Sequence, residues 1–318
     1  MQRRILVAVA LAGLCLAGAG RAEPPKSPDG LAIAPGPPTP EADPQKPAET
    51  IRLAADAASR LTLPVMVDGQ GPFDFVIDTA AERTVLSREL AATAHLPAGP
   101  AILVRGAAGD ETEATARVRA LQVGERTVRD VDAPLLAAAD LGAMGMLGVD
   151  ALKDQHIVLD FQHHRMTSRL SRSGRDPEDA NAIVVRGQYR FGELILVDAH
   201  IRNVVVYVIL DTGAQTSIGN PALRRMLTTG DPVADHFFDT KVISVTGQTV
   251  PAEYKVISSL DIGALTVRNL PLAFARLHTF DIYGLRDRPA LLLGMDILAK
   301  FRRVTIDFKQ REVDFGLY

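Results

Sequence analysis

Two aspartates occupy corresponding places in the chain, each directly after an apolar run. Asp211 follows the apolar residues 208–210, and Asp78 follows 75–77. An ionised carboxylate at the end of a buried strand is unfavourable unless it is hydrogen-bonded or neutralised. Two such carboxyl groups in contact share one proton, so that one acts as an acid and the other as a base. A water between them can lose a proton to the base while the acid protonates a carbonyl oxygen, which is general acid–base hydrolysis of an amide.

The residues after each aspartate suit such a site. Thr79 and Thr212 are expected to hydrogen-bond across the pair, or to nearby backbone, and so to stiffen both loops. Gly213 permits close approach of a substrate backbone or of the opposite loop. Ala80 occupies the same place in the first loop, where its methyl group is expected to narrow the cleft or shift the loop.

An internal repeat explains how residues so far apart in sequence would meet. Five segments recur in the same order and at similar spacing in the two halves of the chain, which indicates a tandem duplication. The matching segments are 75–81 with 208–214, Gly109 with Gly247, 121–130 with 260–269, 146–152 with 292–298, and 158–161 with 305–308. Duplicated domains pack around a pseudo-two-fold axis, where Asp78 and Asp211 are expected to face each other.

Short apolar runs separated by Gly, Pro, Asp and Asn predict an all-β fold, a sandwich or barrel. Helices are expected at 87–94 and at 221–227, and short helices capped by Asp150 and Asp296 are expected after Gly148 and Gly294. Glycine-containing hairpins follow each aspartate by a few tens of residues. They are expected to close over a bound peptide as flaps, and their glycines are Gly106, Gly109 and Gly247.

The N-terminal region predicts export. Arg3 and Arg4 precede an apolar run at 5–19, and small residues follow, which is typical of a secretory signal. The run is shorter than the roughly 18 residues of a membrane span. We therefore expect a periplasmic protein, with secretion or an uncleaved signal anchor as alternatives. The predicted segments are a signal peptide at 1–22, a Pro-rich disordered linker at 23–50, a first lobe at 51–170, a linker at 171–182 and a second lobe at 183–318.

Composition argues against several other classes of protein. The net charge of -3, the absence of Trp and only 5% aromatic residues argue against nucleic acid as a partner. Cys15 is the only cysteine and lies in the predicted signal, so neither disulfides nor thiolate metal sites are expected. His163 and His164 have no third ligand at a recognisable spacing, and H-E-x-x-H is absent. We expect no metal and no cofactor.

The Asp-Thr-Gly-Ala loop at Asp211, together with the apolar-apolar-Gly sequences that end at Gly148 and Gly294, resembles the retropepsin-like aspartic proteases. The two copies in one chain resemble the bilobal pepsin arrangement, and the export signal resembles that of bacterial periplasmic members. The resemblance covers 51–318. It implies two acid-protease-like β-barrel lobes related by a pseudo-two-fold axis, with Asp78 and Asp211 in the catalytic positions. It also places Gly148 and Gly294 in the strands behind them.

The resemblance implies an exported aspartic endopeptidase that acts on polypeptides, as a monomer with an intramolecular pseudo-dimer. Two alternatives remain open at this point. One is a peptide-binding protein of the same fold in which Ala80 impairs catalysis. The other is a homodimer that pairs like copies of one lobe.

Overall fold

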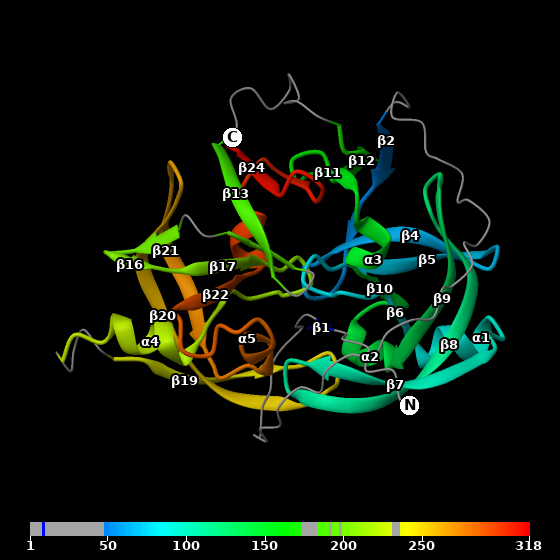
Figure 1. Cartoon of the computed structure of the whole chain (residues 1–318), viewed down its shortest axis with the longest axis horizontal. Coiled ribbons are helices and arrows are strands. Elements are labelled where there is room, and N and C mark those ends of the chain that lie inside the picture. The colour runs from blue at the N-terminus through cyan, green and yellow to red at the C-terminus, as the bar shows by residue number, and fades with distance from the viewer. Residues whose placement is uncertain (1–7, 10–47, 173–182, 191–192, 197–198, 231–235) are drawn as a thin grey trace, which may run out of the picture.

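The computed structural model describes residues 8–9, 48–172, 183–190, 193–196, 199–230 and 236–318. These residues form two β-rich lobes side by side, joined by a sheet along one edge (Figure 1). The predicted all-β fold with two tandem lobes is therefore confirmed. Most of the predicted signal peptide, of the Pro-rich segment and of the linker at 171–182 lies outside the described residues.

The first lobe is built around hairpins that curl into a barrel, because β4 pairs with both β5 and β8. Two-residue strand β1 (Ala8–Val9), inside the predicted signal, pairs in parallel with Arg105 and Gly106. The elements of this lobe are β3 (Ala54–Ala55), β4 (Leu61–Val67), β5 (Gln70–Ile77), β6 (Val85–Ser87), α1 (Arg88–Thr93), β7 (Ala98–Gly106), β8 (Gly109–Val123), β9 (Arg126–Leu136), α2 (Ala138–Leu141), β10 (Gly145–Leu147) and α3 (Val149–Leu152).

From β17 onward, the second lobe repeats the order of elements that the first lobe shows from β5. Its elements are β14 (Glu193–Leu196), β15 (Ala199–Ile201), β16 (Val204–Val205), β17 (Tyr207–Leu210), β18 (Ile218–Gly219), α4 (Pro221–Leu227), β19 (Phe238–Ile243), β20 (Thr249–Ile262), β21 (Leu265–Phe274), α5 (His278–Ile282), β22 (Ala290–Leu293) and α6 (Met295–Leu298).

The strand pairing shows that the repeat is structural. In the first lobe β5 runs parallel to β10, which is antiparallel to β6, and β6 is parallel to β9. In the second lobe β17, β22, β18 and β21 pair in the same four-strand pattern. Each aspartate therefore follows the first strand of an equivalent pattern, β5 or β17, as the duplication predicts.

A run of six strands within a larger sheet joins the lobes, in the order β13-β24-β23-β11-β12-β2. Antiparallel strands β11 and β23 meet at its middle, with Val158 opposite Thr305. These two residues are equivalent in the repeat, so the pseudo-two-fold axis passes between them. The strands are β2 (Glu49–Arg52), β11 (Gln155–Asp160), β12 (Arg165–Leu170), β13 (Ile183–Arg190), β23 (Arg303–Asp307) and β24 (Glu312–Gly316). Strand β2 begins two residues before the boundary expected from sequence.

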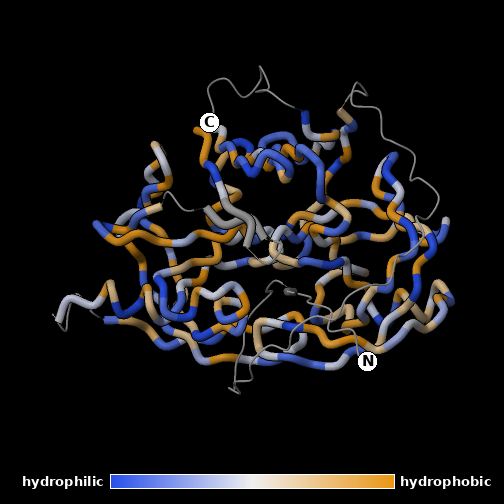
Figure 2. The backbone as a smooth tube through the Cα atoms, viewed as in Figure 1, coloured by the Kyte–Doolittle hydropathy of each residue, from blue (hydrophilic) through white to orange (hydrophobic). Residues whose placement is uncertain are grey.

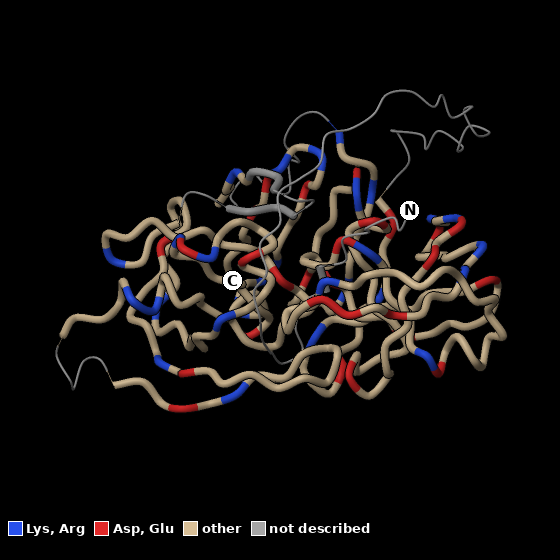
Figure 3. Tube along the Cα trace, turned by 60° about the horizontal axis from the view of Figure 1, so that its bottom comes forward, with Lys and Arg blue, Asp and Glu red and all other residues tan. Residues whose placement is uncertain are grey.

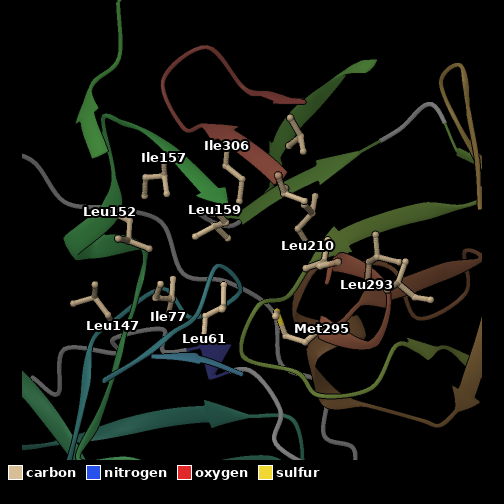
Figure 4. Packing of buried hydrophobic residues seen from close by; sticks show 14 of the residues in the cluster. Leu61, Ile77, Leu147, Leu152, Ile157, Leu159, Leu210, Leu293, Met295 and Ile306 are labelled. Carbon is tan, nitrogen blue, oxygen red and sulfur yellow. The ribbon is translucent and has the colours of Figure 1, made fainter. Parts of the chain in front are cut away.

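One apolar core crosses from lobe to lobe beneath this sheet (Figure 4). It contains equivalent residues from the two copies, for example Ile77 and Leu210, or Leu147 and Leu293, each at most 3% exposed. Full burial of such a side chain contributes roughly 1.5–3 kcal/mol. The shared core fixes the two lobes relative to each other and so fixes the ends of β5 and β17.

The helices that the sequence predicts are present. Ser87 caps α1 by accepting from the N–H of Leu90, and Asn220 caps α4 by accepting from Leu223, with Pro221 in the first turn. The short helix α6 after Gly294 is present as expected, whereas α2 and α5 were not predicted. They have no more than five residues each, too few to show a helical period.

The surface carries both signs of charge. Acidic and basic residues are interspersed along both lobes (Figure 3), and polar and apolar residues alternate along the long hairpin strands (Figure 2). In the part of the chain that the structure describes, no helix is both long and apolar enough to cross a membrane.

Candidate active site

The structure brings the two aspartates together at the junction of the lobes. Asp78 follows β5 and donates its N–H to the carbonyl of Leu147 at 3.0 Å, and Asp211 follows β17 and donates to Leu293 at 3.0 Å. Both side chains are fully buried, and the charge of Asp78 acts directly on Asp211. Two equivalent carboxyl groups thus occupy one desolvated site.

The two threonines bind the opposite loop reciprocally. The Thr79 N–H donates to Oγ1 of Thr212 at 3.1 Å, and the Thr212 N–H donates to Oγ1 of Thr79 at 3.2 Å. Each hydroxyl also donates across the axis, Thr79 to Leu210 O at 2.8 Å and Thr212 to Ile77 O at 2.7 Å. Because these groups are buried, the reciprocal hydrogen bonds of the two threonines fix the spacing of the two aspartates.

Each carboxylate is oriented by its own loop. The N–H of Ala80 donates to Oδ1 of Asp78, and the N–H of Ala214 donates to Oδ1 of Asp211, both at 2.9 Å. Burial and then the charge of Asp78 raise the pKa of Asp211 well above its usual range. Oδ2 of Asp211 is buried without a hydrogen-bond partner among the described residues. A proton shared by the two carboxyl groups avoids two negative charges in one buried site. One group can then act as acid and the other as base.

Ala80 fits its place without backbone strain. Neither Ala80 nor Gly213 is among the residues with positive φ, so the loop conformation does not require glycine. The methyl group of Ala80 lies in a buried apolar cluster with Ala107 of the first lobe and Phe280 of the second. The alanine therefore contributes to the contact between the lobes.

Gly148 and Gly294 lie directly behind the two loops. A side chain at Gly148 would meet the backbone of Arg83, and one at Gly294 would come within 2.9 Å of the Ala214 carbonyl. The prediction that these glycines are part of strands was slightly wrong. Each follows the last residue of its strand and begins a short helix, α3 or α6, whose first N–H binds the active-site loop.

A second pair of aspartates, Asp150 and Asp296, hydrogen-bonds to the ends of the two active-site loops. Asp150 accepts from the N–H and hydroxyl of Thr84 at 2.9 and 2.8 Å. Asp296 accepts from the same groups of Ser217 at 3.0 and 2.6 Å. Burial raises the pKa of both carboxyl groups. The sequence suggested only helix caps at these aspartates, because Thr84 and Ser217 lie 66 and 79 residues away.

The two hairpins expected from the sequence, which the prediction assigns as flaps, are present. Strands β7 and β8 turn between Gly106 and Gly109, and β19 and β20 turn through Gly247, which has a φ of 78°. The tips approach each other from opposite lobes, since a side chain at Gly106 would contact Thr246 at 3.8 Å. Gln248 also donates to Glu111 across this gap. The two hairpins therefore meet on the side of the molecule away from the joining sheet (Figure 1).

Helix α5 of the second lobe holds the flap of the first. The His278 N–H donates to Ala107 O at 2.9 Å, and the His278 ring lies 2.9 Å from Asp110. Tyr283, at the end of this helix, donates its hydroxyl to Ala80 O at 3.3 Å. No local sequence pattern indicates these contacts.

A pocket of about 620 Å³ opens beside the Asp211 loop, between the lobes. Its walls include Gln215 and Thr216 of that loop, Lys241 of the second flap, and Asp56 and Arg60 of the first lobe. The pocket is of a size to take peptide side chains. Within the described ranges, no three His, Cys, Asp or Glu side chains are grouped as a metal site.

Comparison with known families agrees with this geometry. The aspartyl protease family profile matches residues 63–151 and 197–297, one segment in each lobe and together more than half of the chain. Among curated proteins no significant match is found. The chain belongs to the aspartyl protease family, with two tandem lobes of the retropepsin-like kind.

Proposed function

We propose that this protein is an endopeptidase that hydrolyses peptide bonds with a water activated between Asp78 and Asp211. The observation that carries the proposal is the pairing of two fully buried, equivalent carboxyl groups on loops that the reciprocal threonine bonds hold rigidly. Membership of the aspartyl protease family supports the same chemistry.

The reaction uses one ionised and one protonated carboxyl group. The ionised group takes a proton from the water, whose oxygen attacks the scissile carbonyl carbon while the protonated group gives its proton to the carbonyl oxygen. The resulting tetrahedral diol then collapses. One hydroxyl of the diol gives its proton to the ionised carboxyl group as the carbonyl re-forms and the C–N bond breaks. The amine nitrogen takes the proton of the other carboxyl group, so the pair returns to its singly protonated state.

The flaps supply the substrate site in this proposal. A peptide in extended form can hydrogen-bond to hairpin backbone, while its side chains enter pockets such as the one beside Gln215. Meeting of the hairpin tips over the peptide excludes water from the carboxyl pair. Gly109 and Gly247, both with positive φ, allow the tight turns at these tips.

We further propose that the protein works outside the cytoplasm, in the periplasm, as a monomer. The basis for export is the N-terminal sequence: Arg3 and Arg4 followed by the apolar run at 5–19. The basis for a monomer is that one chain supplies both aspartates. Fractionation of cells and the solution mass of the active protein test these two points.

The test of the main proposal is cleavage of a peptide library by the wild type and by three variants. Asp78→Asn and Asp211→Asn are each expected to abolish cleavage. Asp261→Asn, whose carboxylate binds Thr266 at the β20–β21 turn, is the matched control and should cleave normally. Full cleavage by either of the first two variants would disprove a shared pair.

The second candidate function is peptide binding without hydrolysis, which the alanine at position 80 favours. It predicts a wild type that binds extended peptides and cleaves none, and an Ala80→Gly variant that gains turnover. Cleavage by the wild type rules it out.

A further inference from the structure

Among the residues that the structure describes, Arg60 is the largest fully buried side chain, with only 1% of its surface exposed. It ends a tight turn that Asp56 organises. The Asp56 carboxylate accepts from the N–H of Ala58 at 2.9 Å and of Arg60 at 2.8 Å, and from Nε of Arg60 at 2.7 Å. The turn therefore fixes the direction of the guanidinium.

The other end of the guanidinium contacts both lobes. Nη2 donates to Leu141 O at the end of α2 in the first lobe. Nη1 lies 3.4 Å from Gly213 O, in the loop that carries Asp211 in the second lobe. A buried cation is costly unless several partners satisfy it, and here the partners include the backbone of an active-site loop.

Gly142 makes room for this contact. It follows α2 with a φ of 72°, and a side chain there would overlap Nη2 of Arg60 and approach the Asp56 carboxylate. A residue with a Cβ would thus be strained and would also displace the guanidinium.

The equivalent carbonyl in the other loop has a different partner. Ala80 O accepts from the hydroxyl of Tyr283, an uncharged group from the second lobe. A neutral donor is thus sufficient to hold such a loop. The Gly213 carbonyl, by contrast, accepts from a cation, and the charge of Arg60 acts on Asp211 in the direction that favours ionisation, against burial and Asp78.

We infer that Arg60 is a positioning residue that holds the Asp211 loop in register with Asp78 and favours the singly ionised carboxyl pair over the fully protonated one. The inference rests on the proposed peptidase function for its kinetic part. Besides the carboxyl pair itself, the charged groups at this point are Asp56 on the same turn, Asp140 on α2 and Lys241 on β19, which line the same pocket.

The test compares the pH profile of kcat/KM in five variants. The quantity of interest is its acidic limb, the pH range in which the rate falls as the pair becomes fully protonated. Arg60→Met should move the limb to higher pH and lower kcat/KM about tenfold to a hundredfold, mostly through kcat, because the loop loses its donor. Arg60→Lys keeps the positive charge, so the acidic limb should stay near its original pH. The variant lacks the planar guanidinium that bonds to several partners at once, so part of kcat should be lost. Asp56→Asn should move the limb to lower pH, because it exposes the pair to more of the guanidinium charge.

Arg60→Met leaves Asp56 buried without its cation, which threatens folding. The double variant Asp56→Asn/Arg60→Met removes both charges. It should place the limb between those of the two single variants and retain the loss of kcat. Arg117→Gln, in an exposed ion pair with Asp132, is the control and should change neither quantity.

A carbon-13 NMR titration of labelled aspartate carboxyl groups measures the same ionisation without turnover. Opposite shifts in Arg60→Met and Asp56→Asn support the inference, because a merely structural role would not move the titration in opposite directions. Identical titrations in folded wild type, Arg60→Met and Asp56→Asn would overturn it. A wild type that cleaves no peptide refutes the proposed function, while the titration still decides the role of Arg60.

Discussion

Replacement of Thr212 by valine tests how strongly the two lobes are locked at the site. The Thr212 hydroxyl accepts from the Thr79 N–H at 3.1 Å and donates to Ile77 O at 2.7 Å. Valine keeps the volume and removes both bonds. A buried polar group left without its partner costs about 1–3 kcal/mol. The variant should therefore lose about 2–4 kcal/mol of unfolding free energy.

The assay is urea unfolding at one pH, with the midpoint and slope both fitted. Thr212→Ser keeps the hydroxyl and should lose about 1 kcal/mol or less, for one buried methyl group. Thr127→Val, at an exposed position of β9, is the matched control and should stay within about 0.5 kcal/mol of the wild type. A Thr212→Val protein as stable as this control would refute the view that the threonine exchange locks the lobes.

A double-mutant cycle sharpens the result. Thr79→Val removes the symmetric bonds to Leu210 O and from the Thr212 N–H. Because the two hydroxyls belong to one network, the double variant should cost clearly less than the sum of the single variants. Displacement of the loops should also lower kcat about a hundredfold in each single variant. Strict additivity in unfolding would mean that the two loops are held independently.

Three further predictions follow from the same geometry. Ala80→Gly should lose about 1 kcal/mol of stability, through backbone entropy and lost packing, without a gain in turnover; faster cleavage would show that the methyl group obstructs the site. Gly294→Ala should lose about 1–3 kcal/mol in thermal unfolding, because its Cβ would lie 2.8 Å from the Thr216 backbone and 2.9 Å from Ala214 O, and an unchanged melting temperature would contradict this. The pKa of Asp211 is raised in the folded state. The protonated carboxyl group therefore stabilises the fold fully below the pKa of the unfolded chain, near 3.9, and this contribution is lost as the pH rises through the pKa of the folded protein. Asp211→Asn should accordingly gain stability relative to the wild type between about pH 4 and pH 7 in urea unfolding, and a difference independent of pH would disprove the burial of a titrating carboxyl group.

The sequence was sufficient to locate the two aspartates and the duplication. Both signals are local: an apolar strand, a carboxylate and a turn, with Asp78 and Asp211 as their centres. The repeat then implied an axis, and β11 and β23 meet across it with Val158 opposite Thr305. Short-range patterns therefore predicted the lobes, the flaps and the place where the aspartates meet.

Local sequence patterns could not predict the residues that hold the active-site loops in place. Arg60 and Gly213 are separated by 153 residues, and Tyr283 and Ala80 by 203. The stretch 56–60 carries no hydrophobic period, and α5 is a single turn. Only the packing of one lobe against the other gives these side chains their partners. The different partners of the Gly213 and Ala80 carbonyls likewise depend on three-dimensional contacts.

The pH profile of kcat/KM for peptide cleavage by the wild type tests the central claim most directly. A pair that needs one ionised and one protonated carboxyl group predicts a bell-shaped profile. Its acidic limb marks loss of the first proton from the pair and its alkaline limb loss of the second. Cleavage whose rate stays constant through the acidic range would contradict catalysis by Asp78 and Asp211.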